Sequence, residues 1–109
     1  MSNPEHYTYR VTWSREDEEY VGTVAEMQGL SWLEPTQEAA FQGIRRLVAG
    51  VIEDMKKTGE APPEPIAERT FSGKFQVRIP PELHRQLALE AAEQNVSLNR
   101  LVSKRLVGT

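Results

Sequence analysis

Cysteine is absent from the 109 residues, and histidine occurs only as His6 and His84. Without cysteine the chain has no disulfide, no thiolate nucleophile and no thiolate metal ligand. Two histidines in separate segments do not form the clustered ligand set that a metal site requires. We therefore expect no metal, no cofactor and no catalytic residue.

A long apolar run is also missing. No stretch approaches the length of about 20 residues that a membrane-spanning helix needs, and the first residues lack the basic-then-apolar pattern of a signal peptide. Hydrophobic residues make up 39% of the chain and charged residues 27%, a balance typical of soluble globular proteins. We expect a cytoplasmic protein that makes no membrane contact.

The net charge of −3 conceals a division between two parts of the chain. Residues 1–70 hold seven Lys and Arg against thirteen Asp and Glu, whereas residues 71–109 hold six against three. An acidic part joined to a basic part indicates a different partner for each. DNA suits the basic part, and a basic protein suits the acidic part.

Residues 71–79 alternate between apolar and polar side chains, which predicts a strand. The two kinds fall on opposite faces of it, namely Phe75, Val77 and Ile79 against Lys74, Gln76 and Arg78. Pro80 and Pro81 come next, and proline both ends a strand and suits the start of a helix. Any half-exposed surface strand alternates in this way, so the residues after the strand decide its interpretation.

Two short amphipathic helices follow the prolines. Asn95 is expected to close the first in the left-handed conformation, and Ser97 is expected to cap the second. The apolar residues recur at helical spacing in both helices: Leu83, Leu87, Ala88 and Ala91 in the first, then Leu98, Leu101, Val102 and Leu106 in the second.

One strand and two short helices are too small to bury a core of their own. Below roughly 40 residues a fold usually needs a disulfide, a metal or a partner chain. We therefore expect two copies to pair their strands antiparallel as a ribbon. Such a ribbon fits the major groove of B-form DNA, where Arg and Lys suit guanine and Gln suits adenine. Lys74, Gln76 and Arg78 are the predicted base contacts.

Residues 1–70 predict a separate unit with strands and a helix. Residues 7–14 and 20–25 favour a hairpin with a charged turn, and residues 30–33 favour a short third strand. A helix is expected from a cap at Thr36 to a stop at Gly59. Its apolar stripe is expected to cover the sheet, and consists of Phe41, Ile44, Val48, Val51, Ile52 and Met55.

The two tryptophans and the prolines of residues 60–70 raise separate questions. Trp13 shares a strand face with Tyr9 and Val11, so it is expected in the core. Trp32 is expected either in the core, which is the favoured interpretation, or as an exposed anchor for a partner. Together with Glu34 it is the candidate partner contact.

Residues 60–70 hold three prolines, which indicates a stiff extended linker or an added edge strand around Ile66.

The run Lys-Phe-Gln-Val-Arg-Ile-Pro-Pro-Glu-Leu-His from Lys74 to His84, with residues 91–102, resembles a ribbon-helix-helix DNA-binding domain. In that family the amides at the start of the second helix hold a DNA phosphate, and helix N-termini favour anions. The resemblance implies phosphate contacts at Ser97, Leu98, Asn99 and Arg100. Asn95 stands where many members have glycine.

The order of hairpin, Gly-Leu-Ser, Thr-Gln-Glu-Ala-Ala, long helix and proline-rich linker resembles the HicB antitoxin family. This implies an α+β chain with a degenerate ribonuclease-H-like domain of three or four antiparallel strands over residues 1–70. A dimerising ribbon-helix-helix over residues 71–109 comes after it. The resemblance implies a homodimer or tetramer that neutralises a small basic HicA-like ribonuclease toxin and represses its own operon at a palindromic operator.

Two other functions compete with that of an antitoxin. The alternative is a stand-alone ribbon-helix-helix regulator whose N-terminal domain binds a small ligand or oligomerises. A nuclease needs carboxylates that converge on metal ions, whereas residues 16–19 crowd four of them into a turn. We therefore expect no enzyme activity.

Overall fold

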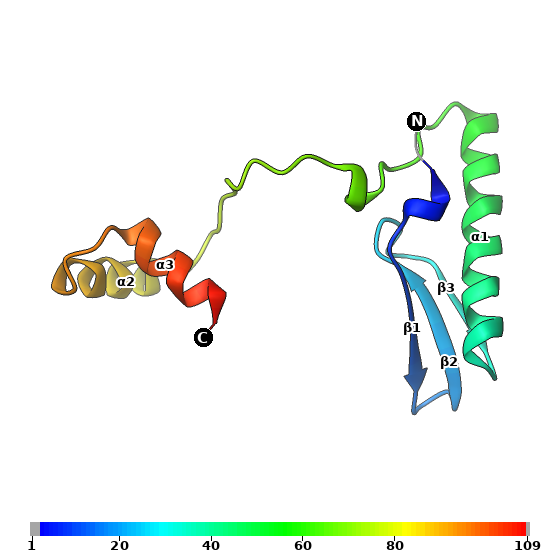
Figure 1. Cartoon of the computed structure of the whole chain (residues 1–109), viewed down its shortest axis with the longest axis horizontal. Helices are drawn as coiled ribbons and strands as arrows, with labels where there is room; N and C mark the ends of the chain where they lie inside the picture. Colours follow the sequence, from blue (N-terminus) through cyan, green and yellow to red (C-terminus); the bar gives the residue numbers. More distant parts are fainter. Residues whose placement is uncertain (1–2, 109) are drawn as a thin grey trace. The chain divides into compact units, whose positions relative to one another are not determined.

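The computed structural model describes residues 3–108. The chain divides into two compact units, Met1–Phe71 and Ser72–Thr109. Figure 1 labels the helices and strands along the chain.

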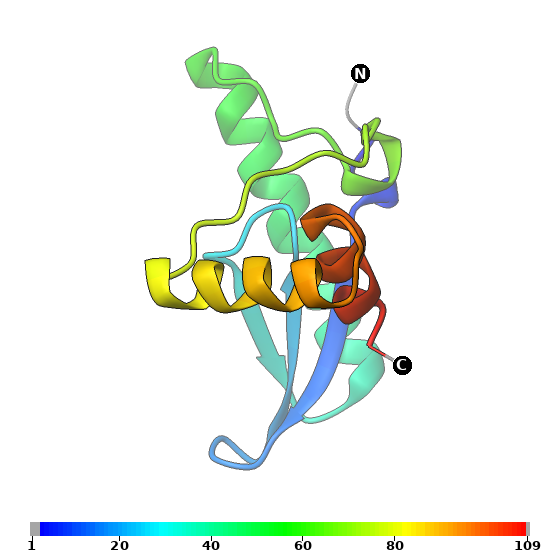
Figure 2. The ribbon, with the colours of Figure 1, turned by 90° about the vertical axis from the view of Figure 1, so that its left-hand side faces the viewer.

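The first unit is a three-stranded antiparallel sheet with one long helix on one of its faces (Figures 1 and 2). The strand order is β1-β2-β3. The predicted hairpin, third strand and helix are confirmed, with the bounds β1 (Tyr9–Ser14), β2 (Glu19–Val24), β3 (Ser31–Glu34) and α1 (Gln37–Thr58). A short 3-10 helix, η1 (Pro4–His6), precedes β1.

Both ends of α1 are fixed by the residues expected there. The Thr36 hydroxyl accepts a hydrogen bond from the Ala39 amide at 3.2 Å, which satisfies one of the donors left free in a first helical turn. At the other end Gly59 has φ 80°, a left-handed conformation that glycine adopts without strain. The sequence signals for this helix are confirmed.

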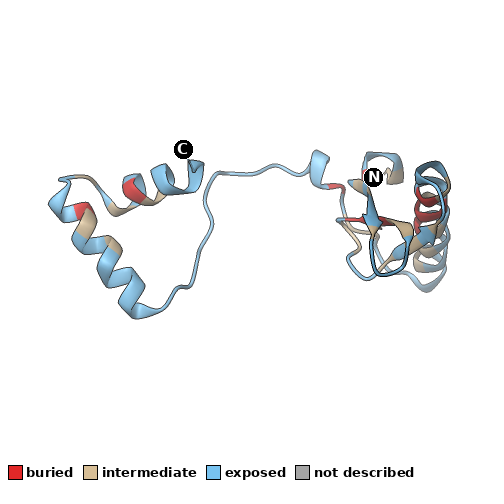
Figure 3. Cartoon of the chain, turned by 90° about the horizontal axis from the view of Figure 1, so that it is seen from below, coloured by how far each residue is buried: buried red, intermediate tan, exposed pale blue. Residues whose placement is uncertain are grey.

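The core lies between α1 and one face of the sheet. Its buried residues come from the segment before β1, from β2 and from the predicted stripe of α1 (Figure 3), and are Tyr7, Val24, Ile44, Val48 and Ile52. The first residue of the stripe, Phe41, is 38% exposed and meets Tyr9 edge-on at 6.0 Å between ring centroids. The core is thus centred on the middle of the helix, with Ile44, Val48 and Ile52.

Two glycines allow α1 to approach the sheet closely. A Cβ on Gly22 in β2 would lie 2.7 Å from the Ala40 carbonyl oxygen. A Cβ on Gly43 in α1 would lie 2.0 Å from Cδ1 of Trp32, whose half-buried ring packs against the core. The favoured interpretation of Trp32 as a packing residue is confirmed.

Trp13 corrects a prediction. It was expected in the core, but it is 54% exposed. The predicted strand face is correct. Val11 and Trp13 lie two residues apart on the same face of β1; Val11 pairs with Gly22 of β2, and Trp13 pairs with Tyr20 in the next cross-strand row toward the hairpin turn. That outer row lies beside the hairpin turn, where α1 begins, and the helix does not extend far enough to cover the indole.

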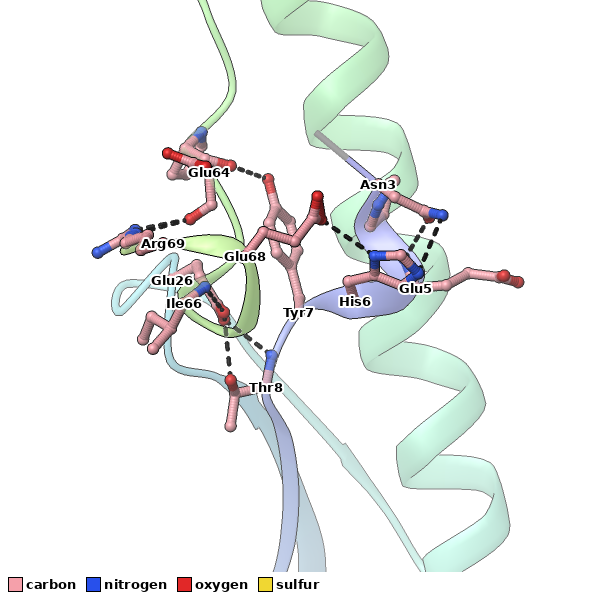
Figure 4. A network of polar contacts seen from close by, with 12 residues as sticks. Asn3, Glu5, His6, Tyr7, Thr8, Glu26, Glu64, Ile66, Glu68 and Arg69 are labelled. Carbon is pink, nitrogen blue, oxygen red and sulfur yellow. Dashed lines mark hydrogen bonds and ion pairs between the residues drawn. The ribbon is translucent and has the colours of Figure 1, made fainter. Parts of the chain in front are cut away.

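The proline-rich segment is also different from the prediction. Neither an extended linker nor a fourth strand forms around Ile66; instead a 3-10 helix, η2 (Ile66–Glu68), forms there, and Pro65 is buried. The segment is held to the first unit by hydrogen bonds to residues far away in sequence (Figure 4). The Tyr7 hydroxyl donates to the Pro63 carbonyl at 2.7 Å.

Glu26 is the centre of this attachment. Its carboxylate accepts hydrogen bonds from the Ile66 amide at 2.9 Å, the Thr8 amide at 2.9 Å and the Thr8 hydroxyl at 3.2 Å. Burial raises the pKa of the Glu26 carboxyl, but these hydrogen bonds outweigh it and hold the pKa below its ordinary value. One carboxylate therefore joins the start of β1 to residues 63–69.

The contact between Gly43 and Trp32 yields a matched pair of predictions. Gly43→Ala forces the Trp32 ring to move and should lower the free energy of unfolding by about 1–3 kcal/mol. Gly50→Ala, in the same helix but with no atom within 4 Å of the added Cβ, should raise it by about 0.5–1 kcal/mol. Urea unfolding followed by tryptophan fluorescence reports on this unit, because both tryptophans lie in it. Equal effects of the two substitutions would contradict the close approach.

The Glu26 carboxylate makes the stability of the first unit depend on pH. Because its pKa is lowered in the folded state, its contribution is complete above the ordinary glutamate pKa of about 4.3 and is lost as the pH falls through the folded value. Glu26→Gln should lower the free energy of unfolding by about 1 kcal/mol at pH 7. The difference from the wild type should shrink below about pH 4.

The control for this prediction is Glu53→Gln, which removes an exposed carboxylate from α1. It should leave the stability profile unchanged between pH 3 and pH 7, a range that spans the ordinary glutamate pKa of about 4.3. If Glu26→Gln and the control gave the same profile, Glu26 would not hold the 63–69 segment.

Candidate nucleic-acid interface

The second unit contains the two helices predicted after the prolines. They are α2 (Pro81–Glu93) and α3 (Leu98–Val107). Pro80 is the N-cap of α2 and Pro81 is its first residue, where the missing N–H of proline costs no helical hydrogen bond. The predicted helix start is confirmed.

The turn between the helices depends on Asn95. Asn95 has φ 57°, and its amide donates to the Ala92 carbonyl at 3.1 Å, while the Val96 amide donates to the Ala91 carbonyl at 3.0 Å. These two hydrogen bonds are those of a Schellman motif, which usually has glycine in the left-handed position. The expected left-handed asparagine is confirmed.

The start of α3 has the cap that the sequence predicted. The Ser97 hydroxyl accepts a hydrogen bond from the Arg100 amide at 3.0 Å, and the Leu101 amide makes the first intrahelical bond, to the Ser97 carbonyl. The amides of Leu98 and Asn99 precede that bond and belong to the first turn, where helices leave donors for anions. Of the four residues expected to contact phosphate, Arg100 has its amide already occupied and offers its guanidinium.

The second unit buries little of its apolar surface. Among its described residues only Ala91 in α2 and Leu101 in α3 are buried, and most of this unit has the pale blue of exposed residues in Figure 3. An ion pair between Glu90 and Arg105 also joins the two helices. The helical stripes recognised in the sequence therefore have few contacts within one chain.

The predicted strand over residues 71–79 does not form in the single chain. These residues have no regular secondary structure, and Phe75 and Val77 are 75% and 65% exposed. A strand needs a neighbour with which to exchange hydrogen bonds, so the strand stays a prediction for the paired chains. The prediction placed that neighbour in a second copy of the chain.

The three residues expected to contact bases lie in this same exposed segment. Lys74, Gln76 and Arg78 are all exposed. The segment begins with a turn that was not predicted, in which Gly73 has φ 85° and the Lys74 amide donates to the Ser72 hydroxyl at 3.1 Å. The Ser-Gly pair was the signal for this turn.

The candidate partner residues, Trp32 and Glu34, contact each other in the first unit. The Trp32 indole N–H donates to Oε2 of Glu34 at 2.8 Å, and both side chains are half-buried. The indole is therefore engaged by Gly43 on one side and by a carboxylate at its edge. Contact of these two residues with a partner remains a prediction.

Metal-binding clusters and membrane-spanning helices are both absent from the described part of the chain. Within residues 3–108, no three His, Asp or Glu side chains gather where they could hold a metal ion. In the same range, no helix has both the length and the apolar character that crossing a bilayer requires.

The described residues define a small α+β chain in which a sheet-and-helix unit precedes a pair of capped helices. A model of the HicB family matches residues 52–106, just over half of the 109 residues, so the chain belongs to the HicB family. The match runs from the end of α1 to the last turn of α3. No curated protein and no solved structure matches the chain.

The left-handed Asn95 gives a prediction for the helical pair. Asn95→Ala puts a Cβ without a local hydrogen-bonding group at positive φ and should destabilise the turn by about 1 kcal/mol. Asn95→Gly should be neutral or stabilise it by up to about 1 kcal/mol. Hydrogen exchange of the α2 and α3 amides, at one fixed protein concentration, measures both variants. Faster exchange in the glycine variant than in the alanine variant would contradict the assignment.

Proposed function

We propose that this protein is an antitoxin that neutralises a small basic HicA-like ribonuclease toxin and represses its own operon. The observation that carries the proposal is the HicB family match over residues 52–106. That match includes the exposed segment before α2 and both helices. The physical features of the two units support the two parts of the function separately.

The second unit acts as a dimer in this proposal. Its apolar residues are too exposed for a stable single copy, since large apolar surfaces left open to water mark association sites. A second copy would pair with residues 74–79 as an antiparallel strand and cover the helical stripes. The exposed residues that this pairing would bury are Phe75, Val77, Ile79, Leu83 and Leu106.

The paired strands supply the DNA-binding face in this proposal. With the apolar residues turned toward the helices, Lys74, Gln76 and Arg78 of each copy project from the opposite face of the ribbon. The ammonium, amide and guanidinium groups of these side chains match the major-groove edges of guanine and adenine. A symmetric dimer then favours a palindromic operator.

The start of α3 supplies the phosphate contact. One DNA phosphate group can accept hydrogen bonds from the amides of Leu98 and Asn99 and from the side chain of Arg100. The helix dipole also favours an anion at this end of α3. These contacts carry no sequence information and fix the position of the dimer on the duplex. The excess of positive charge in residues 71–109 acts in the same direction.

The first unit is the toxin-neutralising part in this proposal. Residues 1–70 carry six more acidic than basic side chains, which suits a basic protein and disfavours nucleic acid. The acidic residues do not gather as a metal-dependent nuclease site within the described part of the chain. The unit therefore serves as a binding surface in this proposal.

The DNA-binding part is tested by a gel-shift titration on the DNA upstream of the gene. Arg78→Ala removes a predicted guanine contact and should weaken binding to the operator by about 1–3 kcal/mol, with relaxed sequence preference at one position of each half-site. Arg10→Ala makes the same change of charge at an exposed position of β1 and serves as the control. Equal operator affinity of the wild type and the Arg78 variant would contradict the ribbon.

The antitoxin part is tested by asking whether a neighbouring gene encodes a small basic HicA-like protein, and then by purifying that protein. The purified full chain should inhibit the ribonuclease activity of that protein at an equimolar ratio. Operator binding without any such inhibition would instead favour the stand-alone regulator, whose N-terminal unit binds a small ligand or oligomerises.

A further inference from the structure

The hairpin end of the first unit carries an exposed aromatic pair. Trp13 and Tyr20 pair across β1 and β2, with ring centroids 5.0 Å apart in an edge-on arrangement. Trp13 and Tyr20 lie on the sheet face that α1 covers farther from the hairpin turn, yet Trp13 is 54% exposed. Figures 1 and 2 show, from two sides, the hairpin turn reaching past the start of α1.

The third member of this row is a carboxylate. Tyr20 pairs with Glu34 of β3, and alternation along the strands puts Trp13, Tyr20 and Glu34 on one face of the sheet. The Trp32 indole N–H holds the Glu34 carboxylate at 2.8 Å. The row thus offers two aromatic rings and one oriented negative charge on a rigid strand framework.

The adjoining turn adds further negative charge. Between Trp13 and Tyr20 the sequence has four acidic residues and a single Arg15. The turn is ordered by hydrogen bonds: the Ser14 hydroxyl donates to Asp17 at 2.8 Å, and the Glu18 amide donates to the Ser14 carbonyl at 2.8 Å. Because the turn is ordered before any partner arrives, less conformational entropy is lost on binding.

We propose that this end of the first unit, the surface of Trp13, Tyr20, Glu34 and residues 16–19, is the site that binds the basic toxin. The inference rests on the proposed antitoxin function and identifies the surface that carries it out. Trp13 is the anchor in place of Trp32, whose ring is already packed on Gly43. An exposed indole with carboxylates around it fits a surface rich in Arg and Lys, because a guanidinium stacks on the ring and pairs with a carboxylate at its rim.

The test measures, by titration calorimetry, the affinity of the full-length protein for the proposed partner, a small basic HicA-like protein from a neighbouring gene. Trp13→Ala should weaken binding at least about tenfold, the effect of losing a central aromatic anchor. The ring is mostly solvated, so circular dichroism should show an unchanged fold. Leu33→Ala, at a 37% exposed position on the opposite face of the same sheet, should bind as the wild type does.

A second pair of variants tests the charge. Glu16→Lys, in the turn, should weaken binding several-fold, and more at low than at high salt, because surface charges are screened by ions. Glu53→Lys makes the same change at an exposed position of α1 and should leave the affinity unaltered. Equal losses in the two variants would mean that net charge, and not this surface, attracts the partner, which would overturn the proposal.

The remaining outcomes separate the surface from the function. If the wild type binds the basic protein and Trp13→Ala binds it equally well, the surface is wrong and the antitoxin function stands. If the wild type does not bind it at all, the proposed function fails and the surface fails with it. If Trp13→Ala instead lowers the mass of the free protein in light scattering, with no loss of partner affinity, the occupant is a second copy of the chain, and the proposal is overturned.

Discussion

The burial of apolar side chains is the constraint on which both units depend, and the two units meet it differently. In the first unit one helix is long enough to cover a face of the sheet, so Ile44, Val48 and Ile52 are buried within one chain. The second unit has two short helices and an unpaired segment, and within its described part only Ala91 and Leu101 are buried. Backbone order alone cannot offset the loss of chain entropy, and this small burial is the physical basis of the proposed pairing with a second copy.

Close contact between α1 and the sheet requires small residues on both sides. Gly22 lets the helix backbone approach β2, and Gly43 makes room for the Trp32 ring. The Trp32 edge then orients Glu34, so packing in the interior determines where a surface carboxylate lies. A core contact and a candidate binding surface are thereby connected through one side chain.

Local signals in the sequence predicted most of the secondary structure. Apolar periodicity located α1, α2 and α3, and the caps at Thr36 and Ser97 form as expected because a cap depends only on residues within one turn. The left-handed Asn95 and the proline start of α2 depend on equally short distances along the chain. Each of these features is set by a few neighbouring residues, which is why the sequence alone was sufficient.

Features that depend on distant residues were not predicted. The exposure of Trp13 depends on where α1 begins relative to the hairpin, which strand alternation does not encode. The attachment of residues 63–69 requires Glu26 and Tyr7 to meet groups about 40 and 56 positions away. For Lys74, Gln76 and Arg78, the residues proposed to contact DNA, alternation predicts a shared strand face but not their geometry, because the strand that would align them needs a second chain in the proposal.

The attachment of residues 63–69 also determines how much free chain separates the two units. With Arg69 closing η2 and the proposed ribbon starting at Lys74, four residues act as the tether, and an extended tether of that length reaches at most roughly 14 Å. In the proposed complex, a tether this short would limit how far each sheet unit can move from the ribbon. In the proposed dimer, two sheet units would then be tethered within reach of one another, at an effective concentration far above that of free chains.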